Sequence, residues 1–352
     1  MVGAIQIQAP SGCKTSRKGY KCKSQHSDRR KTMIARRFIP LWITASLLLT
    51  MFLVGTFQFD GFASGRVVTN LLRDNAFLLI TALGMTLVII SGGIDLSVGA
   101  VIALSGVVSS LLITEYQWHP LLAFAVILPL GTLFGALMGS IIHVYKLQPF
   151  IVTLAGMFLA RGLATTLSEE SIAIDHPFYD AVAEMSIALP GNAALDLSSL
   201  IFILFFVIIA IVMHYSRFGT NVYAIGGNQH SAELMGISIA KTTISIYAIS
   251  SFLATLAGIV FTFYTFSGYA LGAIGVELDA IAAVVIGGTL LTGGSGFVLG
   301  TVLGVILMGV IQTYITFDGS LSSWWTKIVI GLLLFFFILL QKLLNGRKTQ
   351  HG

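Results

Sequence analysis

Charged residues are scarce in this chain of 352 residues. Asp, Glu, Lys and Arg together make up 10% of the sequence, whereas hydrophobic residues make up 56% and the mean hydropathy is +0.91. So little polar surface could not keep a globule of this size in aqueous solution. The composition therefore excludes a water-soluble protein and predicts an integral membrane protein.

Motifs for nucleotide binding and for catalysis are also absent from the sequence. There is no G-x-x-x-x-G-K-[ST] segment, so the chain has no P-loop to hold nucleotide phosphates. There is no H-E-x-x-H segment, and the seven His are scattered, so a metal-dependent hydrolase site is not visible. Ser, Asp and His are not grouped for nucleophilic catalysis. These absences argue against an enzyme and favour a gated path through the membrane.

Both cysteines, Cys13 and Cys22, fall within residues 1–37, which also contain half of all Lys and Arg. They have no metal-ligand spacing, and we assign them no function. We interpret residues 1–37 as a solvated basic tail. The apolar run behind it is too long for a cleavable signal peptide and no small-x-small site follows. Met33 precedes an ordinary first span, so we expect it to be the natural initiator.

Apolar runs of about 20 residues, the length that crosses a bilayer, recur along the rest of the chain. Runs such as Leu78–Ile90 are apolar on both faces, which excludes the alternating strands of a barrel. The predicted fold is an all-α polytopic membrane protein with one transmembrane domain at 38–344, a short tail at 345–352 and about ten spans. The predicted spans are 38–57, 76–91, 97–113, 120–142, 149–167, 199–214, 244–266, 279–292, 297–315 and 327–344.

The positions of Lys and Arg predict the orientation, because positive charge is retained on the cytoplasmic side. An even number of spans places both termini on one side. That side would carry the basic tail and Lys146, Arg217, Lys241, Lys342, Arg347 and Lys348. The other side would carry only Arg66, Arg73 and Lys327. The segment 168–198 would then lie outside, and it contains six acidic residues and no Lys or Arg. We therefore predict that both termini are cytoplasmic.

A polar stretch at 215–243 interrupts the apolar sequence. Its centre, Gly226–Ile237, is typical of a short helix outside the membrane. Asn228 is a good N-cap, Gly236 stands where a helix commonly ends, and Gly226 with Gly227 lets the chain turn. Two interpretations stay open, a docking surface for a partner and a solvated connector between two spans.

Two glycine-rich segments, Ser91–Gly99 and Val285–Gly296, interrupt the spans. In the first, Asp95 either caps the next helix or belongs to irregular backbone that lines a cavity. The similarity of the two segments, together with Thr-Leu-Ala-Gly at both 153–156 and 255–258, suggests two related halves, as in many transporter folds.

Other small residues and one cation stand inside the predicted spans. Gly residues at 131, 135 and 139, and at 300 and 304, are expected to let helices approach closely. Arg161 has either a functional or a structural role. In the structural role, its side chain would reach the outer headgroups or pair with Glu169 or Glu170.

Three segments carry a resemblance to a known family. Ser91–Gly99, Tyr223–Ile237 and the second glycine-rich segment resemble the permease subunits of monosaccharide ABC importers of the ribose and arabinose type. The similarity extends over nearly the whole chain from about Met33. Segments 168–177, 268–271, 275–279 and 317–327 look most like those of bacterial galactofuranose permeases. The extension before Met33 departs from the family pattern.

The resemblance implies a multi-pass permease of the bacterial inner membrane. Its implied partners are an ABC ATPase, a second permease, a periplasmic sugar-binding protein and membrane lipid, with no nucleic acid. This chain would bind no cofactor, since ATP is used by the ATPase. The segment at 226–237 would be the coupling helix that contacts the ATPase through Gly226, Gly227, Asn228, Glu233 and Gly236.

A sugar path needs polar side chains along the spans. The candidates are Asp95, Asn75, Thr86, Thr153, Glu277 and Asp279, and further Thr81, Thr255, Thr262, Tyr264 and Gln312. Each hydroxyl or amide could instead bind a neighbouring backbone carbonyl. The alternative function is an ion-coupled secondary sugar transporter, for which Asp95, Glu277 and Asp279 are the plausible ion ligands.

Overall fold

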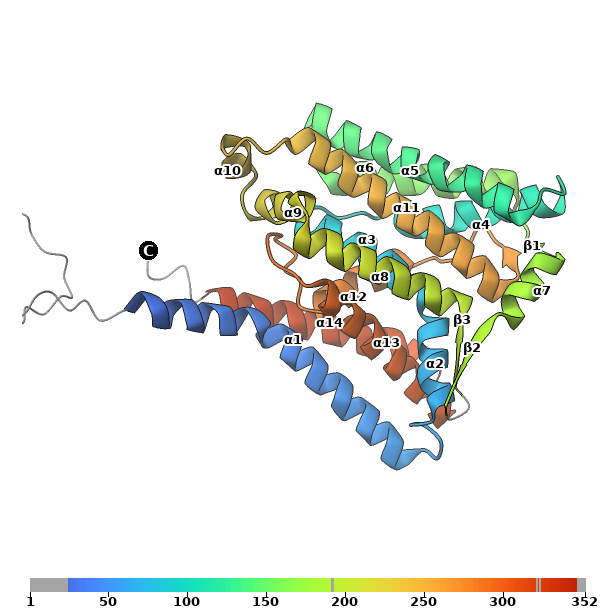
Figure 1. Ribbon diagram of the computed structural model, residues 1–352, viewed down its shortest axis with the longest axis horizontal. Coiled ribbons are helices and arrows are strands. Elements are labelled where there is room, and N and C mark those ends of the chain that lie inside the picture. The colour runs from blue at the N-terminus through green and yellow to red at the C-terminus, as the bar shows by residue number, and fades with distance from the viewer. Residues whose placement is uncertain (1–24, 191–192, 321, 323, 347–352) are drawn as a thin grey trace, which may run out of the picture.

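The computed structural model describes residues 25–346 except 191–192, 321 and 323, and the described part is a bundle of helices (Figure 1). Cys13 and Cys22 lie outside the described residues. The helices are α1 (Gln25–Gln58), α2 (Gly65–Asp74), α3 (Ala76–Ile90), α4 (Val98–Thr114), α5 (Pro120–Tyr145), α6 (Pro149–Leu167), α7 (Pro177–Glu184), α8 (Leu197–Tyr215), α9 (Arg217–Gly227), α10 (Gln229–Leu234), α11 (Ile239–Thr265), α12 (Val276–Ile286), α13 (Val298–Asp318) and α14 (Trp324–Gly346).

Seven helices of the described part are long and apolar enough to cross a membrane. They lie in α1, α5, α6, α8, α11, α13 and α14, close to seven of the ten predicted spans. An eighth span would be the pair α2 and α3, which are bent by 55° at Asn75. The prediction of a polytopic all-α membrane protein is confirmed.

The predicted count of ten spans is not confirmed. The span expected at 279–292 is wrong in extent, because α12 ends at Ile286 and has 11 residues. A helix of that length covers about 16 Å, roughly half of the hydrocarbon thickness. Gly288 has a φ of +92° and ends the helix in the left-handed conformation. Helix α4, with 17 residues, is likewise shorter than the seven long helices.

The centre of the bundle is formed by α3 and α11. All but one residue of α3 is buried, and α11 packs against α3, α4 and α5. The predicted packing role of the glycines in α5 is confirmed, because a Cβ at Gly131, Gly135 or Gly139 would collide with α11. At Gly135 the collision is with the carbonyl oxygen of Tyr247. Gly300 and Gly304 of α13 approach the backbone of α12 in the same way.

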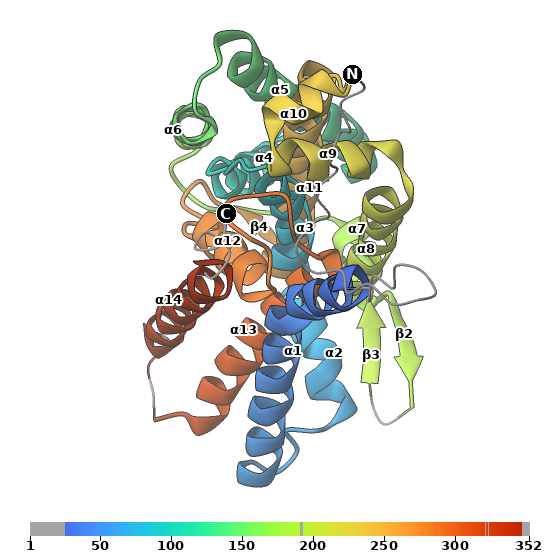
Figure 2. The same ribbon diagram turned by 90° about the vertical axis from the view of Figure 1, so that its left-hand side faces the viewer.

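Short strands cover one end of the bundle. β1 (Ile172–Ala173) pairs with β4 (Ser267–Gly268), and β2 (Ser186–Leu189) forms an antiparallel hairpin with β3 (Ala193–Asp196). Figure 1 shows these strands and α7 at the end opposite to α10. The start of α1 and the end of α14 lie at the same end as α10. Figure 2 views the bundle from that end, with α9 and α10 in front. The assignment of this end to the cytoplasm stays a prediction.

The glycines of α5 and α6 give a matched test of backbone packing. Gly135→Ala is expected to destabilise the protein by about 1 to 3 kcal/mol, because the added methyl group overpacks the contact with α11. Gly162→Ala in α6 has open space around the new methyl group and is expected to be neutral or slightly stabilising. Thermal unfolding in detergent would measure both, and equal melting temperatures would contradict the packing role.

Candidate functional site

The polar stretch forms two helices, α9 and α10, instead of one. The Oδ1 atom of Asn228 accepts a hydrogen bond from the Ser231 N–H at 2.8 Å, so the predicted N-cap is confirmed. Gly236 has a φ of +82°, and its N–H donates to the Glu233 carbonyl at 2.9 Å. The Ile237 N–H donates to the Ala232 carbonyl at 3.1 Å. The predicted end of the helix at Gly236 is therefore confirmed.

Gly226 lies at a contact between three segments that are far apart in the sequence. A Cβ at Gly226 would overlap the Ile90 carbonyl oxygen and lie 2.6 Å from the Gly294 nitrogen. The Gly294 N–H donates to the same Ile90 oxygen at 2.8 Å. Glycine is thus needed here for close backbone approach, and not for the chain turn that the sequence suggested. We call the set Gly92, Gly226, Gly227, Gly293 and Gly294 the glycine junction.

The glycine junction is built of direct backbone contacts. A Cβ at Gly293 would lie 2.8 Å from the Gly92 nitrogen, and a Cβ at Gly294 would lie 2.8 Å from the Gly227 Cα. The junction therefore joins the end of α9 to the turn after α3 and to the turn before α13. Three of the four Gly-Gly pairs in the sequence contribute to the junction and were the available signal, but their partners could not be read from the sequence.

The turns after α3 and α12 have the same hydrogen bonds. Gly92 donates to the Ile89 carbonyl and Gly93 to the Val88 carbonyl, at 2.9 and 3.0 Å. After α12, the Gly288 N–H donates to the Val285 carbonyl at 2.9 Å, and the Thr289 N–H donates to the Val284 carbonyl at 3.2 Å. Gly92 and Gly288 both have positive φ, +87° and +92°. The same Schellman geometry ends α10 at Gly236 and is common at helix ends, so two related halves stay a prediction.

The tip of α10 is uncovered in the described part of the chain. Leu234 and Met235 are 76% and 69% exposed, and the Glu233 side chain is exposed. A Cβ at Gly227 or Gly236 would meet no atom within 4 Å. This end of the molecule thus presents two large apolar side chains beside a carboxylate.

Asp95 is fully buried between the start of α4 and α11. Its Oδ1 atom accepts hydrogen bonds from the Ser97 N–H at 3.0 Å and the Ser97 hydroxyl at 2.6 Å. Its Oδ2 atom accepts from the Ser250 hydroxyl at 2.8 Å. Asp95 therefore binds the backbone N–H of the N-cap residue Ser97, and not an N–H of helix α4 itself. The carboxylate also links α4 to α11.

The threonine candidates bind the backbone of their own helices. Thr86 donates to the Ala82 carbonyl at 2.6 Å and lies 2.7 Å from the Thr301 hydroxyl. Thr153 lies 2.9 Å from the Pro149 carbonyl oxygen. The hydroxyls of Thr81, Thr255 and Thr262 are likewise bonded to carbonyls three or four residues earlier. These five side chains lie between packed helices.

Glu277 and Arg161 lie near the start of α12. The Glu277 Oε1 atom accepts from the Gly275 N–H at 3.2 Å, and Oε2 is buried without a partner among the described residues. Arg161 donates to the carbonyls of Ala270 and Gly272 at 2.6 and 2.7 Å. The structural role expected for Arg161 is supported, but its partners are these carbonyls and not Glu169 or Glu170.

A cavity of about 470 Å³ lies at the opposite end from α10, and we call it the α2 cavity. It brings together four path candidates, Asn75, Asp279, Tyr264 and Gln312. Asp95, Thr86, Thr153 and Glu277 do not line it. The residues that the sequence analysis missed include Asn70, Asp74, Phe77, Phe261, Thr313, Thr316 and Phe317.

The polar groups of the α2 cavity differ in how they are held. The Asn75 amide donates to the Leu71 carbonyl at 2.9 Å. Asp279 accepts from the Lys327 ammonium at 2.6 and 2.8 Å, which links α12 to α14 at the cavity. Gln312 is exposed, and no hydrogen bond of its side chain occurs within the described residues. The amide of Gln312 is thus free to bind a solute.

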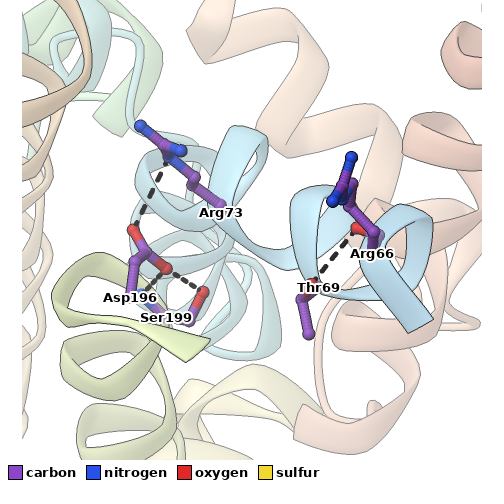
Figure 3. A network of polar contacts seen from close by, with 5 residues as sticks. All are labelled: Arg66, Thr69, Arg73, Asp196 and Ser199. Atoms are coloured by element: carbon purple, nitrogen blue, oxygen red, sulfur yellow. Dashed lines mark hydrogen bonds and ion pairs between the residues drawn. The ribbon is translucent and has the colours of Figure 1, made fainter. Parts of the chain in front are cut away.

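A polar network fixes α2 beside this cavity (Figure 3). The Arg73 Nε atom lies 4.0 Å from Asp196 Oδ2, and Asp196 Oδ1 accepts from the Ser199 N–H and hydroxyl at 3.2 and 2.6 Å. Thr69 donates to the Arg66 carbonyl at 3.2 Å. Arg73 therefore joins α2 to the strand β3 and to the start of α8.

Helix α7 is anchored to α11 near the same end. The Tyr179 hydroxyl lies 3.0 Å from the Thr262 hydroxyl, and the Tyr179 ring packs against Phe263. Burial raises the pKa of Tyr179 to about 12, with the Thr262 hydrogen bond acting in the opposite direction. The phenol is therefore neutral at physiological pH and can serve as a hydrogen-bond donor.

Comparison with known proteins identifies the family. The model of the branched-chain amino acid transport system/permease component family matches residues 67–338. The inner membrane ABC transporter permease protein YjfF of Escherichia coli K12 is 56% identical over 307 residues, 87% of this chain and 93% of that protein. The fructose import permease protein FruG of Bifidobacterium longum is 38% identical, over 87% and 92% of the two chains. The ribose import permease protein RbsC of Escherichia coli K12 is 34% identical, over 90% and 99%.

No solved structure matches the chain. The family match covers most of the sequence, and it agrees with the seven apolar helices that can cross a membrane. The chain therefore belongs to the branched-chain amino acid transport system/permease component family and is a multi-pass permease of the inner membrane.

Proposed function

We propose that the chain is the permease subunit of a monosaccharide importer of the ABC class and that it forms the path for galactofuranose. The similarity to ribose and fructose import permeases supports the sugar class. The proposal that the transported sugar has the furanose ring form rests on the resemblance of segments such as 168–177 to galactofuranose permeases. The chain binds no cofactor of its own, and a separate ATPase supplies the energy from ATP.

The observation that carries this proposal is the glycine junction. Helix α10 has an uncovered apolar tip, and the end of α9 that precedes it touches the backbone of the turn after α3 and of the turn before α13. A partner that presses on α10 would therefore displace both turns without an intervening flexible side chain. We assign Gly226 to this transmission, and Gly227, Asn228, Glu233 and Gly236 to the contact with the ATPase.

The α2 cavity is the proposed entrance of the sugar path. Asn75, Asp279, Tyr264 and Gln312 supply polar groups, while Phe77 and Phe261 supply aromatic rings. Such a combination suits a sugar, which has hydroxyl groups and apolar ring faces. Asp95, Thr86, Thr153 and Glu277 would then act in helix packing near the path. A sugar-binding protein docks at this end, and a second permease completes the path.

The protein interconverts between states that open the path to opposite sides. Sugar-loaded binding protein and ATP shift this equilibrium only by their different affinities for the two states. An ion-coupled symporter is the alternative, but its expected ligands are separate. Asp95 binds two serines, Asp279 binds Lys327, and no group of three or more His, Cys, Asp or Glu side chains occurs among the described residues.

The first prediction concerns transmission through the glycine junction. Gly226→Ala is expected to reduce ATP-dependent sugar uptake strongly, because the methyl group forces α9 away from Ile90 at a cost of about 1 to 3 kcal/mol. The ATPase should still co-purify, since the tip of α10 is unchanged. Gly331→Ala in α14 has open space and serves as the matched control. Normal uptake by the Gly226 variant would refute the transmission role.

The second prediction concerns the α2 cavity. Gln312→Leu removes one hydrogen-bonding amide and is expected to raise the half-saturating sugar concentration for uptake about fivefold. Gln148→Leu, at an exposed position at the other end of the bundle, should leave it unchanged. Uptake by membrane vesicles containing the complete transporter would measure both. Identical saturation curves for the two variants would exclude Gln312 from the path.

A further inference from the structure

A second cavity, of about 400 Å³, lies at the α10 end of the bundle, and we call it the α10 cavity. It shares no lining residue with the α2 cavity. Its walls come from the turn after α3, the connection between α5 and α6, helix α10 and the first part of α11. The volume is within the range of small-molecule sites. The cavity therefore has room for a small ligand next to the helix that we assign to the ATPase contact.

Tyr247 of α11 provides a hydroxyl that nothing in the described part of the chain satisfies. The residue is 2% exposed, lines the α10 cavity, and its hydroxyl oxygen is buried without a hydrogen-bond partner. A Cβ at Gly93 would overlap this oxygen, so the glycine leaves the hydroxyl its place. An unbonded buried hydroxyl is costly. A hydrogen-bonding molecule in the cavity would remove that cost.

The mouth of the α10 cavity carries groups of both charges. Lys146 and His143 come from the end of α5, and Glu233 and Gln229 come from α10. Lys146 and Glu233 are exposed, and neither takes part in an ion pair within the described residues. A ligand with a net charge would be attracted by one of these side chains and repelled by the other. A neutral ligand with several hydroxyl groups can accept from Lys146 and donate to Glu233.

We propose that the α10 cavity binds a monosaccharide from the side of the membrane on which α10 lies, and that the bound sugar slows import. This proposal rests on the proposed function. The ligand would bridge Glu233 of α10, Lys146 and the Tyr247 hydroxyl, which belong to three separate elements. It would therefore stabilise the conformation in which this space is open. A displacement of α10 by the ATPase would have to overcome this binding energy, so accumulated sugar would inhibit its own uptake.

The test uses the complete transporter in vesicles that contain ATP and increasing interior concentrations of D-galactose, whose solutions contain both ring forms. The initial rate of uptake of labelled sugar should fall as interior galactose rises, relative to vesicles loaded with an equal concentration of a non-sugar osmolyte. Tyr247→Phe removes the hydroxyl and keeps the ring. It should raise the half-inhibitory interior concentration about fivefold, as expected for the loss of one hydrogen bond.

Two further variants complete the design. Lys146→Met should also raise the half-inhibitory interior concentration, because it removes a hydrogen-bond donor at the mouth of the cavity. Tyr145→Phe is the matched control, since Tyr145 is 70% exposed at the same end and does not line the cavity. If interior galactose does not slow the wild-type protein, or if Tyr247→Phe and the wild type are inhibited equally, the cavity holds only water and the proposal is wrong.

A binding measurement separates this proposal from the proposed function. Saturation-transfer NMR with D-galactose on the purified full chain in lipid nanodiscs does not require transport. A signal that is weakened by Tyr247→Phe but not by Tyr145→Phe supports the site, and equal signals in the two variants overturn it. A failure of the proposed function would appear differently, as absence of ATP-dependent uptake into vesicles without interior sugar.

Discussion

Close approach of helix backbones at glycine is the constraint on which the rest of this structure depends. Lipid offers no hydrophobic drive for helix association, so contacts within the bundle rely on tight packing. The glycines of α5 bring it against α11, those of α13 bring it against α12, and Gly226 brings α9 against the turn after α3. At all of these places except Gly131, which faces the Thr255 side chain, a methyl group would collide with another backbone, so side-chain rearrangement could not relieve the overlap.

This packing makes the α10 end of the protein mechanically continuous. A short helix whose only link to the spans was a flexible loop would move without effect. Here the Ile90 carbonyl oxygen accepts a hydrogen bond from the Gly294 N–H, in the turn before α13. The same oxygen is in van der Waals contact with Gly226 at the end of α9. A push on α10 therefore reaches the turn after α3 and the turn before α13 together.

Polar side chains fall into two groups according to where their hydrogen bonds go. The five threonines proposed for the path bind carbonyls of their own helices, and Asp95 binds serines of two elements. Such groups are satisfied without a solute, so they stabilise packing. Gln312 at one end, and Lys146, Glu233 and Tyr247 at the other, have no such bonds within the described residues and line cavities. Unsatisfied groups that face a cavity are those able to select a solute.

The sequence by itself determined the class of protein, the positions of seven long spans, the Asn228 cap and the end of α10 at Gly236. These features depend on hydropathy and on hydrogen bonds between near neighbours, which a local pattern can predict. Only the tertiary structure decided that α12 is short, that Gly226 packs on Ile90, and that Asn75 and Gln312 share a cavity while Thr86 and Thr153 do not. Whether a side chain faces a cavity or a neighbouring helix depends on helices that are distant in the chain, and no local pattern records their position.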